Sequence, residues 1–292
     1  MELKKGIMLF NESDETYNNI TINSGVLPAN EQEIPKVEYG SYSYYPLYEE
    51  DARLPKRNWR SLTKKEISIL RPTEKRTDTN TIYTGKLPDN LVELLEKLEL
   101  KKSTSRAEVF ERFQADKSTT EKVNKMMEAF LNTKANGKPH KIHYLGTNLP
   151  NMEVVACDTT VMPKGYKEED KVYLGIHNDG TYYVPFRTIR NSGNRLTINL
   201  GLETRYFMFI NLTMSQAYNM IKKNFDLTNH TVDVINISKY FYACFPDYPV
   251  LRIEQKPYEY YVAPTDNCFH DGCTLGNKEL DIVLAYLGAF RY

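Results

Sequence analysis

The spacing of apolar positions changes character along the chain. Between Pro88 and Ala135, leucine, phenylalanine and methionine recur every three or four positions, which is the spacing of one face of a helix. From residue 141 onward, short runs rich in β-branched and aromatic residues are separated by turn-forming residues, a pattern typical of strands. The pattern therefore predicts a group of helices followed by a β-rich region.

Three consecutive helices are predicted in the first of these regions. The first is LVELLEKLEL, which follows Pro88. The second is RAEVFERFQA, which Ser105 precedes with Glu108 three positions later, the spacing of a capping box. The third begins at Ser118 and ends before Asn136-Gly137, a common helix stop. We expect these helices to cover the outer face of a sheet and to carry no catalytic group.

The C-terminal region predicts eight strands and one helix, roughly Ser215–Lys223. Eight short strands with one helical insertion are typical of a double-sheet jelly roll rather than of a βαβ fold. We expect an α+β, mainly β fold, with residues 1–140 as an N-terminal arm and helical support and 141–292 as a distorted double-stranded β-helix (jelly-roll) core, together one compact unit. The predicted strands are Val154–Thr159, Val172–His177, Tyr182–Phe186, Arg195–Leu200, Tyr206–Leu212, Val232–Ser238, Glu259–Ala263 and Asp281–Leu287.

Residues 1–85 give a less regular pattern. Short β-prone pieces at Gly6–Phe10, Asn19–Ile22 and Ser41–Tyr48 are separated by prolines and charged residues. The tyrosine-rich third piece fits a lid over a pocket, an edge strand or an extended arm, and the sequence leaves these three interpretations open.

Composition and charge exclude several classes of protein. Lysine plus arginine and aspartate plus glutamate both number 38, so the net charge is zero, and no basic block favours nucleic acid or an anionic membrane. The four cysteines are too few for a disulfide framework, and no CxxC pair predicts a zinc site. No secretory signal or long apolar run is present, so we expect a soluble, cytoplasmic protein.

Candidate chemistry lies at the ends of two predicted strands. The run KVYLGIHNDGT places His177 and Asp179 two positions apart, on one face of a strand and about 7 Å from each other. His270 follows the tyrosine-rich run that ends in Ala-Pro-Thr. Two imidazoles and one carboxylate suit a ferrous ion with half of its octahedron open. The competing interpretation is a pair of polar turns, because Asn-Asp-Gly and Asp-Gly are common turn sequences.

This arrangement resembles the 2-oxoglutarate-dependent non-haem Fe(II) oxygenases over about Val154–Tyr292. The resemblance implies that His177, Asp179 and His270 bind Fe(II), that 2-oxoglutarate and O2 are co-substrates, and that the product is hydroxylated or otherwise oxidised at an unactivated C–H bond. An aspartate at position 179 argues against halogenation, because halogenating relatives have a small residue there.

The same resemblance implies a cation for the distal carboxylate of 2-oxoglutarate, near the start of the last strand. Lys278 is the first choice, with a hydroxyl hydrogen bond from Thr274. Arg205 is the second choice, and Arg195 and Arg291 are rivals.

Two other classes of function stay open at this point. One is a cupin-type mononuclear metal enzyme that uses no 2-oxoglutarate. The other is a non-catalytic jelly-roll binding protein in which the histidines are turn residues. The substrate is expected to be a small polar molecule, such as an amino acid or a natural-product intermediate, and the oligomeric state is left open.

Overall fold

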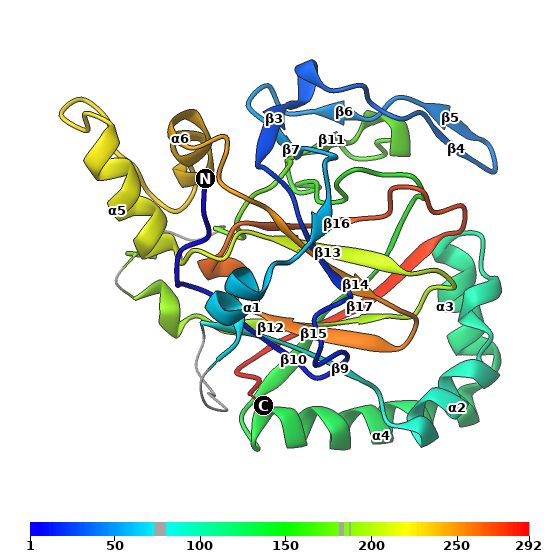
Figure 1. Cartoon of the computed structure of the whole chain (residues 1–292). Coiled ribbons are helices and arrows are strands. Elements are labelled where there is room, and N and C mark those ends of the chain that lie inside the picture. Colours follow the sequence, from blue (N-terminus) through cyan, green and yellow to red (C-terminus); the bar gives the residue numbers. More distant parts are fainter. Residues whose placement is uncertain (73–79, 181–183, 187, 292) are drawn as a thin grey trace.

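The computed structural model describes residues 1–72, 80–180, 184–186 and 188–291 (Figure 1). The fold is mixed, with more strands than helices, as the sequence predicts. Two sheets carry most of the long-range pairing, and the helices lie around them.

The larger sheet is built mainly from antiparallel pairs. Only the β1–β9 pair is parallel among its described strands. Its strands, in order across the sheet, are β1 (Met8–Asn11), β9 (Thr81–Lys86), β15 (Glu259–Ala263), β12 (Asn194–Asn199), β17 (Asp281–Gly288) and β10 (His140–Asn148).

The smaller sheet is antiparallel throughout its described strands. In order they are β16 (His270–Cys273), β13 (Arg205–Phe209), β14 (Leu251–Gln255), β2 (Ile20–Ile22) and β8 (Arg60–Ser61). Residues 1–85 therefore supply strands to both sheets. The division of the chain at residue 140 stays a prediction.

The two sheets face each other across a shared core. The ring of Phe207 on β13 stacks on Tyr261 of β15, with centroids 4.0 Å apart. Fully burying a side chain of this kind stabilises the fold by about 1.5–3 kcal/mol. Gln255 of β14 donates from Nε2 to the Thr197 carbonyl of β12 at 2.9 Å. Both strand orders are linear, so neither sheet closes into a barrel over the residues described, and the jelly roll stays a prediction.

Six α-helices occur in the described part of the chain. The three predicted helices are confirmed as α2 to α4. Ser105 caps α3 by accepting the Glu108 N–H, and α4 ends at Asn136, whose left-handed backbone conformation stops the helix. Phe130 of α4 packs edge-on against Tyr260 at 5.3 Å, on the outer face of the larger sheet. The helices are α1 (Lys64–Leu70), α2 (Asp89–Lys97), α3 (Arg106–Ala115), α4 (Lys117–Ala135), α5 (Met214–Asn224) and α6 (Ile237–Cys244). None of the helices described is long and apolar enough to cross a membrane.

Three two-stranded sheets complete the described strands. The Ser41–Tyr48 piece forms β5 and β6, and β6 pairs in parallel with β11, so this piece lies beside the chain that leads to His177. The pairs are β3 (Val26–Pro28) with β7 (Arg53–Pro55), β4 (Val37–Tyr39) with β5 (Tyr42–Tyr44), and β6 (Leu47–Tyr48) with β11 (Val172–Tyr173).

Two predicted strands are wrong, for reasons visible in their hydrogen bonds. Val154–Thr159 is an irregular segment, because the N–H groups of residues 155 and 156 donate to the Asp271 carboxylate instead of to a neighbouring strand. Val232–Ser238 is a turn that leads into α6, because the Asp233 carboxylate accepts the N–H groups of residues 235 and 236. The predicted Tyr182–Phe186 strand lies partly outside the described residues.

The predicted strand Val172–His177 is only partly regular. Strand β11 ends at Tyr173, and Gly175 has a φ of 75°, which interrupts the extended backbone. A single antiparallel bridge then joins His177 to His270. The strands β10, β14 and β16 were not predicted, and two of them, β10 and β16, border the candidate site.

Candidate metal centre

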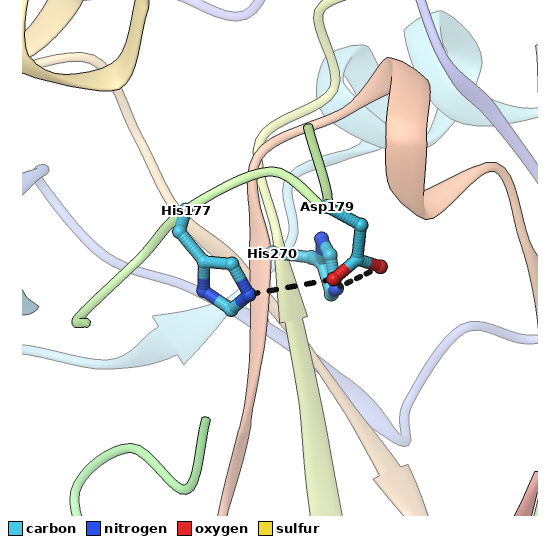
Figure 2. Close-up of side chains that lie close together, drawn as sticks. All are labelled: His177, Asp179 and His270. Carbon is cyan, nitrogen blue, oxygen red and sulfur yellow. Dashed lines mark ion pairs between the residues drawn. The ribbon is translucent and has the colours of Figure 1, made fainter. Parts of the chain in front are cut away.

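Backbone pairing brings three predicted ligands to one place. His177 and His270 exchange two backbone hydrogen bonds, of 3.1 Å and 2.6 Å, and the Asp179 N–H donates to the Thr265 carbonyl at 3.2 Å. The segment that follows β11 is therefore attached to the start of β16. Figure 2 shows the three side chains turned toward one another.

The donor atoms of these side chains converge. His177 Nε2 lies 3.7 Å from Asp179 Oδ1, and His270 Nε2 lies 3.3 Å from Asp179 Oδ2. The two imidazole centroids are 4.9 Å apart. Metal–ligand bonds of about 2.0–2.2 Å place adjacent donors of an octahedron about 3 Å apart. The donor atoms of the set lie within 4.8 Å of one another, which is wider than that spacing, so the side chains would have to move closer together to bind an ion.

Hydrogen bonds on the far side of each ring fix what the rings present to the centre. Nδ1 of His177 lies 2.9 Å from the Gly175 carbonyl, and Nδ1 of His270 lies 3.3 Å from the Cys268 carbonyl. A carbonyl only accepts, so each Nδ1 carries a proton, and Nε2 is the nitrogen of each ring that is directed at Asp179 and could bind a metal. The two Nε2 atoms and the carboxylate converge, and positive charge on or between them, from ring protons or from a metal ion, stabilises this arrangement. The residues present therefore fit a divalent metal.

The pKa values reflect the same electrostatics. Burial would lower the pKa of His177, but hydrogen bonds and charge from Asp179 and Asp271 outweigh it and raise the pKa to about 10. Burial would raise the pKa of Asp179, but His270, His177 and Arg195 hold it well below the usual range. Positive charge between these groups is favourable, whether a proton or a metal supplies it.

Asp271 supports the site from outside the ligand set. Its side chain is fully buried, and Oδ1 accepts backbone N–H groups from Val155, Ala156 and Gly272 at 3.0, 3.1 and 2.7 Å. Oδ2 lies 3.6 Å from His177 Nδ1 and has no hydrogen-bond partner among the described residues. A carboxylate beside the outer nitrogen of a ligating histidine orients the ring and raises its basicity. Sequence reasoning missed this role, because it depends on the loop at 155–156.

Arg195, at the start of β12, borders the site on the other side of Asp179. Its Nη1 lies 2.6 Å from Asp179 Oδ2 and 3.1 Å from Asp266 Oδ1, and it also donates to the Thr265 hydroxyl. The guanidinium therefore compensates the charge of the one carboxylate in the triad. Arg195 was a rival for the co-substrate carboxylate, and the structure places it beside Asp179.

The residues predicted for the co-substrate lie in different surroundings. Lys278 is exposed in the turn between β16 and β17, and the structure does not bring it to the triad. The buried Thr274 hydroxyl donates to the Leu149 carbonyl and accepts from the Met152 N–H, so it anchors a turn. Arg205 is 3% exposed between the sheets, where Nε binds Asp281 at 3.0 Å and Nη1 binds Gln255 at 3.1 Å.

Tyr144 of β10 lies close enough to the triad and to Arg205 to interact electrostatically with both. Burial by the surrounding walls raises the pKa of its phenol, and Tyr261, Arg205 and Asp179 all act on it electrostatically. Yet 43% of the side chain remains accessible.

The comparisons with known proteins do not identify a family. No protein-family model matches the chain, and no curated protein matches it. A solved structure titled "iron and alpha-ketoglutarate-dependent endoperoxidase NvfI" aligns with 92% of this chain and 97% of its own, with a TM-score of 0.26 and 8% sequence identity. A TM-score this low carries no argument about fold or function.

Proposed function

We propose that this protein is a Fe(II)- and 2-oxoglutarate-dependent oxygenase that hydroxylates or otherwise oxidises an unactivated C–H bond of a small polar molecule. One observation carries the proposal: the Nε2 atoms of His177 and His270 and the carboxylate of Asp179 converge, while both Nδ1 atoms face backbone carbonyls. Two imidazoles and one carboxylate on one side of an ion leave its remaining positions for exchangeable ligands.

The order of the strands supports a jelly roll around this centre. Along the chain, eight segments follow one another: β10, residues 172–177, β12, β13, β14, β15, β16 and β17. Numbered one to eight, they give the order 1-8-3-6 in the larger sheet and 2-7-4-5 in the smaller one, with antiparallel neighbours in both. This is the order of two Greek keys folded into a double sheet. The triad then lies where segments two and seven meet.

Burial favours Arg205 over Lys278 as the partner of the distal carboxylate. Arg205 lies in the interior, on a strand beside β16, whereas Lys278 is exposed. A guanidinium has five N–H donors, so its bonds to Asp281 and Gln255 leave others for a ligand. Burying a carboxylate is costly without such a partner.

Each side chain then has a stated task. When bound, the ferrous ion and 2-oxoglutarate would supply the electrons that activate O2, and O2 would be the oxidant for the C–H bond. His177, Asp179 and His270 would hold the ion through three fixed atoms. Arg195 holds Asp179 in place and balances its charge, and Arg205 would orient the co-substrate through its far carboxylate.

The experiment is anaerobic purification, addition of ferrous ion, and measurement of bound iron per chain, followed by measurement of succinate formed from 2-oxoglutarate. We expect one iron per chain and succinate production in the wild type. His270→Ala should lose both while keeping its fold. The matched control is His230→Ala, which makes the same chemical change at an exposed loop position and should keep both.

Each other outcome selects a different class of function. Iron binding that depends on His270, without consumption of 2-oxoglutarate, would favour a cupin-type metal enzyme. A wild-type chain that binds no iron would overturn the metal centre and leave a binding protein. Circular dichroism of both variants separates loss of the site from loss of the fold.

A further inference from the structure

A large cavity opens beside the triad, at one end of the larger sheet. Its volume is about 980 Å³, at the upper end of the 300–1,000 Å³ common for small-molecule sites. It lies where the start of β10, the end of β17 and the start of β12 come together, and these are neighbours in the sheet. The charged residues that line it are Lys138, Lys141, Arg190, Arg195, Arg291 and Asp266.

This cavity is lined by more positive than negative side chains, whereas the whole chain has equal numbers of both. Lysine plus arginine equal aspartate plus glutamate over the whole sequence, yet five cationic side chains and one carboxylate line this space. The cations come from three separated parts of the sequence, so the fold gathers them and no local basic run produces them. Like charges in one concavity repel one another, and an anionic ligand relieves that repulsion.

Arg195 connects the cavity to the triad. It lines the cavity, and its Nη1 also lies 2.6 Å from Asp179 Oδ2. A molecule in the cavity that contacts Arg195 is therefore separated from Asp179, a candidate metal ligand, by the Arg195 side chain alone. The cavity is also separate from Arg205, which is buried between the sheets and does not line it.

We propose that this cavity binds the substrate, and that the substrate is a small organic anion bearing a carboxylate or a phosphate group. This proposal rests on the proposed function, because a substrate requires the triad to be a reaction centre. Lys138, Lys141 and Arg291 would attract and hold the anionic group, and Arg195 would position the molecule next to Asp179. Cations around a concave site also raise the rate at which an anion arrives.

Calorimetry with three matched probes tests the cavity on the metal-free full-length chain. Phenyl phosphate and phenylacetate carry the two candidate anionic groups, and benzyl alcohol carries none. We expect one or both anions to bind and the alcohol to bind at least about tenfold more weakly, a difference of about 1.4 kcal/mol. The better anion identifies the group that is recognised. Its affinity should fall as salt is raised to about 0.3 M, because salt screens charge pairs.

Charge reversals then locate the bound anion. Lys141→Glu and Arg291→Glu should each weaken binding about five- to tenfold, the effect of reversing one charge at about 7 Å in a water-like medium. Lys164→Glu, at an exposed position that does not line the cavity, should change it less than twofold. Arg205→Met should leave probe binding intact if the variant folds. Equal binding of all three probes, equal loss in the Lys164 control, or loss only in the Arg205 variant would overturn the proposal.

Iron titration of the same samples keeps the two proposals distinguishable. If the chain binds the anions in this cavity but binds no iron, the anion site is supported and the proposed oxygenase function is refuted. If the chain binds iron through His270 but prefers none of the anionic probes, the metal centre is supported and the proposed class of substrate is refuted.

Discussion

Replacing Asp271 with asparagine tests whether a buried carboxylate supports the metal centre. The change keeps the size of the side chain and one oxygen, and it removes the charge. In the native protein Oδ1 accepts three backbone N–H groups, and Oδ2 lies 3.6 Å from His177 Nδ1. In the variant an amide NH2 would take the place of Oδ2 and meet the Nδ1 proton of His177, so two donors would face each other.

The size of the effect follows from these contacts. A hydrogen bond to a charged group contributes about 1.5–3 kcal/mol and a neutral one about 0.5–1.5 kcal/mol, so the three backbone bonds weaken together. Removing a buried charge offsets part of that loss. We expect the free energy of unfolding of the metal-free protein to fall by about 1–3 kcal/mol. Loss of a group that orients a ligating histidine typically lowers metal affinity about 10- to 100-fold, or about 1.4–2.8 kcal/mol.

Two measurements on one preparation test this. Urea unfolding with a chelator present gives the stability of the metal-free chain, and competition with a chromophoric chelator gives the ferrous affinity. Asp158→Asn is the matched control, because Asp158 is exposed and accepts the Thr160 N–H within a turn. The control should change stability by no more than about 0.5 kcal/mol and leave metal affinity unaltered.

The outcomes separate two roles for Asp271. A loss of both stability and metal affinity supports the contact with His177. A loss of stability with native metal affinity would refute that contact and leave Asp271 as a support of the loop at 155–156 alone. If both the stability and the metal affinity stay at the wild-type values, both proposed roles of Asp271 are refuted.

Three further predictions concern parts of the fold around the site. Arg205→Met should destabilise the chain by about 3–5 kcal/mol in urea unfolding, because it leaves the Asp281 carboxylate buried without its partner, and adding Asp281→Leu should recover most of the loss. Recovery below about 1 kcal/mol would show that the pair is not the cause. Gly175→Ala should lower both unfolding free energy and metal affinity, since Gly175 has a φ of 75° and an added Cβ would lie 2.7 Å from the backbone of residue 53; a stable variant would contradict this. The Glu66 pKa falls to about 2, chiefly through its hydrogen bond with Arg60. A lowered folded-state pKa means that this stabilisation is complete above the unfolded pKa of about 4.3 and is lost as the pH falls toward 2. Glu66→Gln should therefore be less stable than the wild type at pH 7, and the difference should shrink between about pH 4 and pH 2.

Local signals in the sequence predicted the elements that local interactions decide. The helices α2 to α4 were found because leucine spacing and the cap at Ser105 act within a few residues. Strands β12, β13, β15 and β17 were found because alternation or continuous apolar character marks a buried strand. The convergence of His177 and Asp179 with His270 was predicted as well, from strand ends and from a resemblance.

The sequence did not show where distant side chains would intervene. The segment Val154–Thr159 has the composition of a strand. Two of its backbone N–H groups instead donate to the carboxylate of Asp271, which lies more than a hundred positions later in the sequence. Strand β10 was not among the predicted strands, and it lies at an edge of the sheet, where exposed residues are tolerated. Pairing partners of this kind are set by the whole fold.

The charges of the site bear on the choice between Lys278 and Arg205. Lys278 was the first choice because it lies near the start of the last strand, and the structure places it in an exposed turn. Arg205 is farther than Lys278 from His270 in the sequence, but its strand β13 pairs directly with β16, which begins at His270. Buried charges must be balanced by neighbours in space. Arg205 faces Asp281, and Arg195 faces Asp179. The remaining groups are the two Nε2 atoms directed at the Asp179 carboxylate, and positive charge from ring protons or from a bound metal ion completes the balance there.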